Sequence, residues 1–144
     1  MMEGARNRQA LLEEDFSVES HRLQQALASL ETVGWTMFED EKQCISSANT
    51  NCMTDHDSLR LEFAKVRRKL RLDLKTCLET CVPTMDISAL SHPGSEPALR
   101  SAFLCYRKCV MTSTSATQSA KRQLQEAEIQ LTQKYYSEKK LPTR

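Results

Sequence analysis

Two identical cysteine spacings constrain this chain more than any other feature. Three residues separate Cys77 from Cys81, and three residues separate Cys105 from Cys109. A step of four residues places both sulfurs of a pair on one face of an α-helix, one turn apart. The segment between the pairs contains the turn sequence His92-Pro93-Gly94. We therefore expect a helical hairpin that carries one cysteine pair on each arm.

The cysteines are expected to bridge the two arms and not to close within a pair. Residues four apart on a helix have β-carbons about 5–6 Å apart, whereas a disulfide needs about 3.5–4.5 Å. Antiparallel packing brings each cysteine opposite one from the other arm, and the same register sets large side chains against small ones. The pairs in this register are Cys77–Cys109, Cys81–Cys105, Leu70–Ala116 and Val66–Ala120.

Composition favours an all-α protein and excludes several functions. Only 3 glycines and 4 prolines occur in 144 residues, and the common residues are good helix formers. A net charge of +1 gives no overall attraction for nucleic acid. No apolar run approaches the ~20 residues of a transmembrane helix. We expect neither a nucleic-acid partner nor a transmembrane segment, and the residues indicate no cofactor, metal or catalytic site.

Apolar periodicity predicts three helices, over about 18–45, 55–81 and 96–139, within a single domain of residues 16–140. Residues 1–15 are polar and expected to be loosely held, and 141–144 form a tail. In the first helix the steps alternate between four and three from Leu23 onward, which is typical of an amphipathic helix with one buried seam. The stripe is Phe16, Leu23, Leu27, Leu30, Gly34, Met37, Glu41 and Cys44.

A polar segment, Thr54-Asp55-His56-Asp57-Ser58, precedes the strongest apolar periodicity. Such residues cap helix N-termini, and their negative charge favours that position. We therefore interpret the segment as a helix cap and not as a metal or acid–base cluster.

Cys44 and Cys52 complete an even set of six cysteines. By elimination we expect them to pair with each other. The alternative is that each of them faces outward toward a partner protein. The four cysteines of the hairpin have a second interpretation, an all-thiolate zinc site in a reducing compartment. Disulfides are favoured because zinc sites use tighter ligand spacing.

A basic cluster lies within the second predicted helix and consists of Lys65, Arg67, Arg68, Lys69 and Arg71. Such a run is usually a solvated face. Its functional interpretation is a docking strip for acidic protein or for anionic lipid headgroups, since arginine suits bidentate contacts with carboxylates. No aromatic residues alternate with these cations, which argues against stacking on bases.

Cellular location is inferred from the sulfur chemistry. The N-terminus lacks the apolar stretch of a secretory signal, and acidic residues at 13–15 are atypical of a matrix presequence. Disulfides nevertheless require an oxidising compartment. We therefore expect the mitochondrial intermembrane space, peripheral to the inner membrane.

The paired brackets resemble the twin Cys-x3-Cys proteins of that compartment, which include its small import chaperones. The chain resembles the family called "family with sequence similarity 136" more closely than it resembles those chaperones. Four features carry the likeness: an amphipathic segment from Leu23 to Glu31, the pair Met37-Phe38, the bracket Cys77–Cys81 followed by Val82-Pro83, and the bracket Cys105–Cys109. That family has further brackets after Met-Phe and near its C-terminus, where this chain has only the wider Cys44/Cys52 pair.

The expected function is that of a non-catalytic accessory protein. We expect it to dock on subunits of a larger assembly, such as an inner-membrane respiratory or ATP synthase complex, because the first helix needs a surface for its apolar stripe. One alternative is a carrier of hydrophobic precursors that resembles the import chaperones. Another is a metal-binding or redox carrier.

Overall fold

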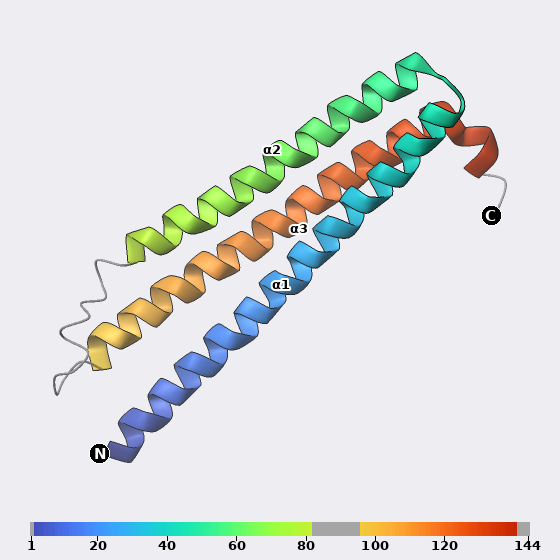
Figure 1. Cartoon of the computed structure of the whole chain (residues 1–144). Helices are drawn as coiled ribbons and strands as arrows, with labels where there is room; N and C mark the ends of the chain where they lie inside the picture. The colour runs from blue at the N-terminus through green and yellow to red at the C-terminus, as the bar shows by residue number, and fades with distance from the viewer. Residues whose placement is uncertain (1, 82–95, 141–144) are drawn as a thin grey trace.

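Three long helices form an elongated bundle: α1 (Met2–Ser46), α2 (Thr50–Cys81) and α3 (Glu96–Lys140). The computed structural model describes residues 2–81 and 96–140, with side chains for 14–81 and 100–135. Helices α1 and α3 run in the same direction and α2 runs opposite to both (Figure 1). The described residues contain no strand, so the predicted all-α fold is confirmed.

Two predicted helix starts are wrong. Helix α1 begins at Met2, so residues 2–15 belong to this helix and do not precede it. Helix α2 begins at Thr50, which places 54–58 inside the helix and not at its cap. The cap is Asn49, whose Oδ1 accepts a hydrogen bond from the Cys52 amide at 3.1 Å. Ala48 reverses the chain just before it with a φ of 53°.

Some predictions lie outside the described residues. These are the turn at His92-Pro93-Gly94 and the 141–144 tail.

The hydrophobic core lies where all three helices meet. Its central side chain is Phe63 of α2, which packs against the backbone of α1 at Gly34. A β-carbon at Gly34 would lie 2.7 Å from the Phe63 ring, so the absence of a side chain permits the close approach. The cluster comprises Leu30, Val33, Met37, Leu59, Phe63, Leu70 and Leu124.

The buried seam of α1 differs from the predicted stripe by one residue at alternate turns. Ala26, Val33 and Asp40 are buried, where the stripe had Leu27, Gly34 and Glu41. Leu27 is 37% exposed. The shift occurs because α1 packs against α3 as well as α2, and a polar contact fixes its rotation: Thr132 Oγ1 of α3 lies 3.3 Å from Asp40 Oδ2.

Disulfides join α2 to α3 in the expected register. Cys77 bonds to Cys109 and Cys81 to Cys105, each with Cα atoms 5.7 Å apart. A third disulfide, Cys44–Cys52, links the end of α1 to the start of α2. Beyond Cys77–Cys109 the same register continues, since Leu70 and Ala116 line one small cavity of about 80 Å³ with these cysteines.

None of the helices has, within the described residues, a stretch that is long and apolar enough to cross a membrane.

Candidate functional site

A groove with an apolar lining lies near the α2–α3 disulfides. It is formed where α1, around Phe16, meets the end of α2 and the start of α3, and we call it the apolar groove. Its volume is about 690 Å³, within the range of ligand-binding clefts. Three aromatic and two leucine side chains line it, and these side chains are only partly buried. Its lining residues are Phe16, Arg71, Leu74, Lys75, Leu78, Glu79, Phe103 and Tyr106.

Disulfides brace two walls of this groove. On α2, Leu74 and Leu78 flank Cys77, and on α3 Phe103 and Tyr106 flank Cys105. The third wall is Phe16 of α1, whose ring centroid lies 6.2 Å from those of both aromatic residues on α3. The cross-links hold the α2 and α3 walls in one register, so an occupant meets a groove that is already formed.

The structure divides the predicted basic strip. Arg67 bonds across to Glu31 of α1 at 2.9 Å, and Lys69 pairs with Asp73 along α2 at 2.7 Å. Lys65, Arg68 and Arg71 make no ion pair with the described part of the chain. Arg71 lines the apolar groove, so the strip and the groove meet at this residue.

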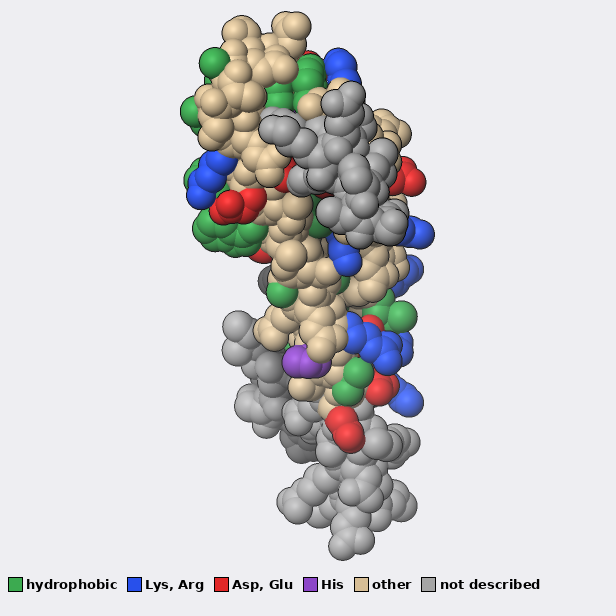
Figure 2. All heavy atoms as spheres, turned by 90° about the vertical axis from the view of Figure 1, so that its right-hand side faces the viewer, with side chains coloured by type: hydrophobic (Ala, Val, Ile, Leu, Met, Phe, Trp, Pro, Cys, Tyr) green, Lys and Arg blue, Asp and Glu red, His purple; other side chains and the backbone are tan. Residues whose placement is uncertain are grey.

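Two exposed leucines extend this surface along α2. Leu61 is 62% exposed and Leu72 is 51% exposed, and Lys65 and Arg68 lie between them at helical spacing. The space-filling view shows lysine and arginine side chains along one edge of the molecule, with hydrophobic and acidic side chains among them (Figure 2). The outer face of α2 therefore offers both apolar area and unneutralised positive charge.

Two further clusters could present metal-binding atoms if their disulfides were open. One is Cys81, Cys105 and Cys109, where Cys81 Sγ lies 3.7 Å from Cys109 Sγ across the two bonds. The other is Cys44, Cys52 and His56. In the described residues, then, the bracket cysteines form two disulfides and not a four-thiolate site.

Polar contacts from Lys134 and Tyr135 anchor α3 to the start of α2. The Tyr135 hydroxyl donates a hydrogen bond to Asp55, and Lys134 Nζ lies 3.1 Å from the same carboxylate. These two donors, Tyr135 first, hold the pKa of Asp55 below its ordinary value. The hydrogen bond to Asp55 raises the pKa of Tyr135 and that of Lys134.

Residue spacing placed Phe16 in an apolar stripe and Arg71 in the basic cluster, but it did not predict the groove. Leu78, Phe103 and Tyr106 lie one or two residues along the sequence from a bracket cysteine. Their proximity to Phe16 depends on how α1 packs. The detectable signal was the set of large apolar residues beside both brackets. That signal does not say which side of the hairpin α1 leaves uncovered.

Comparisons with protein-family models, with curated proteins and with solved structures gave no match to this chain.

Proposed function

We propose that this protein is a non-catalytic docking protein of the mitochondrial intermembrane space. It binds an amphipathic helix of a larger inner-membrane assembly, such as a respiratory or ATP synthase complex. The observation that carries the proposal is the apolar groove, whose α2 and α3 walls are cross-linked by disulfides and whose edge carries Arg71. The oxidised cysteines support the compartment, since such bonds persist only where thiols are not kept reduced.

Charge complementarity specifies the occupant. Lys75 lies 4.0 Å from Glu79, so the groove cation with no described ion pair is Arg71. Arg68 and Lys65 continue the positive charge away from the groove. The occupant must match both the apolar lining and the positive charge at the edge. A helix does so if its apolar side chains contact Leu74, Leu78 and Phe103 and its acidic residues lie on one flank. Arginine contacts carboxylates in a bidentate geometry, which would fix the direction of the partner.

The direct test is native electrophoresis of mitochondria that express tagged protein. We expect Leu74→Glu and Arg71→Glu to lose co-migration with the large complex. Two controls are matched in chemistry: Leu104→Glu on α3 changes an exposed leucine that does not line the groove, and Lys69→Glu alters a cation that pairs with Asp73. Migration of the wild type solely as a monomer, or complexes that resist Leu74→Glu, would refute the proposal.

A carrier of hydrophobic precursors is the second candidate, because the lining of the groove also suits an unfolded apolar segment. This function requires transient contacts with many newly imported chains instead of one stable complex. Site-specific cross-linking from Phe103 separates the two. A single stoichiometric product supports docking, whereas many products that disappear when import stops support the carrier. Cross-links to lipid alone would instead indicate anionic headgroups as the ligand of the strip.

A further inference from the structure

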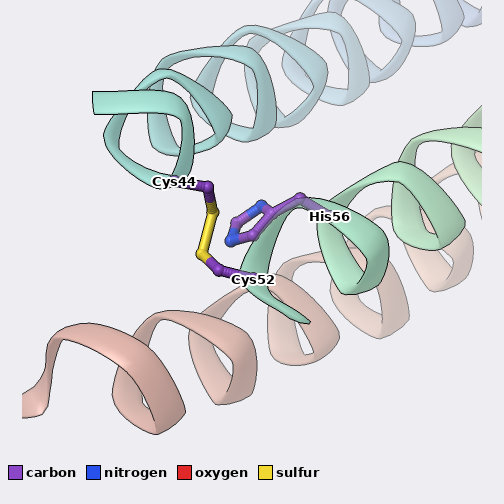
Figure 3. A group of neighbouring side chains, drawn as sticks. All are labelled: Cys44, Cys52 and His56. Carbon is purple, nitrogen blue, oxygen red and sulfur yellow. A yellow bond between two sulfur atoms is a disulfide. The ribbon is translucent and has the colours of Figure 1, made fainter. Parts of the chain in front are cut away.

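A second group of side chains with its own chemistry lies at the other end of the bundle. The sulfurs of Cys44 and Cys52 and a ring nitrogen of His56 all lie within 4.8 Å of one another. Both cysteines are 0% exposed and His56 is 2% exposed. The imidazole lies beside the disulfide between α1 and α2, with one ring nitrogen toward the sulfurs (Figure 3).

The local sequence builds this arrangement. Asn49 starts α2 just after the turn, so that Cys52 and His56, four residues apart, lie on the same face of the helix. Cys44 comes from the last turn of α1, and Ala48 reverses the chain between the two helices. Met53 and Tyr135 pack against the two cysteines, which makes the surroundings apolar.

We propose that Cys44, Cys52 and His56 form a redox-gated site for a thiophilic metal ion, Zn²⁺ or Cu⁺. The disulfide closes the site. A dithiol reductant opens it by supplying two electrons and two protons, which convert the S–S bond into two thiols while the reductant becomes a disulfide. The incoming ion then displaces both thiol protons, which go to solvent, and is held by two thiolates and the neutral imidazole.

The ligand set and its spacing suit such an ion. Two thiolates and one histidine is a known zinc ligand set that leaves a fourth position open, with Zn–S near 2.3 Å and Zn–N near 2.1 Å. Tetrahedral bonds of that length need sulfurs roughly 3.8 Å apart. The Cα atoms of the two cysteines are 5.4 Å apart, so side-chain rotation alone can open that separation once the bond is broken. Zinc sites on one helix also use ligands four residues apart.

The other sulfur cluster does not offer the same switch. Freeing Cys81, Cys105 and Cys109 requires breaking both bonds that join α2 to α3. The Cys44–Cys52 bond encloses a sequence separation of only 8, so its loss removes less chain constraint. Its opening leaves the hairpin cross-linked. The site also lies far from the apolar groove along the bundle, so it does not depend on the proposed docking function (Figure 1).

The test is metal binding by the full chain before and after reduction with a phosphine. Co²⁺ serves as the spectroscopic probe, and Zn²⁺ affinity is measured by competition with a chromophoric chelator. We expect no binding to the oxidised protein. The reduced protein should take up metal with a thiolate-to-cobalt charge-transfer band, and His56→Asn should weaken Zn²⁺ binding at least about tenfold.

Two comparisons keep the result attributable to this site. His21→Asn alters an exposed histidine of α1 and should leave binding unchanged. The double variant Cys44→Ser with Cys52→Ser should abolish metal binding. If that variant does not fold, the ratio of the Zn²⁺ affinities of His56→Asn and His21→Asn decides. The proposal fails if the reduced wild type takes up no metal. It also fails if His56→Asn binds Zn²⁺ as tightly as the wild type, or if binding survives the loss of both cysteines, since the bracket cysteines would then be the ligands.

Discussion

Toward the α1–α2 turn, the three helices share a cluster of buried apolar side chains around Phe63, whereas toward the other end α2 and α3 are joined by two disulfides beside an open groove. The first region is held by packing and needs no cross-link between α2 and α3. The second has small or polar residues such as Ala102 and Ser113 on its buried face of α3. At the end of the bundle with the open groove, the two disulfides therefore hold α2 and α3 together in place of buried apolar side chains.

Removing both bracket disulfides should produce the largest loss of stability. With all four bracket cysteines changed to alanine, we expect the free energy of unfolding to fall by on the order of 5 kcal/mol. The loops have sequence separations of 32 and 24, and the inner bond adds less because the outer one already restricts the chain. Urea unfolding measures the loss.

The matched control for that experiment is Cys44→Ala with Cys52→Ala. Its disulfide has a sequence separation of 8, for which chain entropy gives about 2–3 kcal/mol. An equal or larger loss in the control would mean that the bracket end does not depend specially on its cross-links.

The packed region should respond most to Phe63→Ala. Phe63 is 8% exposed at the centre of the core, and removal of such a ring costs about 3–5 kcal/mol. Leu61→Ala, on the same helix but 62% exposed, should stay within about 0.5 kcal/mol of the wild type. Thermal unfolding by circular dichroism distinguishes them, and similar values for both would contradict the assignment of the core.

Gly34→Ala tests the contact between Gly34 and the Phe63 ring. Alanine favours a helix over glycine by about 1 kcal/mol, but its β-carbon would lie 2.7 Å from the Phe63 ring. Overpacking of this kind costs about 1–3 kcal/mol, so we expect a net loss of roughly 1 kcal/mol. In a Phe63→Leu background the sign should reverse. A double-mutant cycle measures the coupling, and additive effects would show that the two residues do not constrain each other.

The smallest effect should come from Asp55. Because its pKa is lowered in the folded protein, chiefly by the Tyr135 hydrogen bond and then by Lys134, its stabilising contribution is complete above the ordinary aspartate pKa of about 3.9. That contribution is lost as the pH falls through the lower folded value. We therefore expect faster amide exchange at 130–135, relative to the intrinsic exchange rate at each pH, below about pH 4.

Asp55→Asn should give that faster exchange already at neutral pH. Asp57→Asn is the control, because Asp57 pairs with Arg60 on its own helix. Equal exchange in the two variants would mean that Asp55 does not anchor α3.

Much of this architecture could be inferred from residue spacing. Apolar steps of three and four predicted three helices, and the four-residue cysteine steps predicted which sulfurs face each other across α2 and α3. These predictions succeeded because both depend on the period of a single helix, which is fixed by backbone geometry. Cys44–Cys52 followed by elimination.

Other features were decided by how the helices pack. Spacing placed Leu27, Gly34 and Glu41 in the seam of α1, but contact with α3 rotated Ala26, Val33 and Asp40 into it. Neighbouring residues on a helix point only about 100° apart, so a helix with apolar side chains on both flanks can turn either way.

The same reason explains His56 and the groove. Residue spacing was enough to predict the helices and the cross-links that hold two of them in register. The packing of the helices is what buries His56 against a disulfide, so that it is not a cap, and brings Phe16, Phe103 and Tyr106 together beside Arg71. Contacts between distant segments depend on the position and rotation of all three helices at once, which no local pattern encodes.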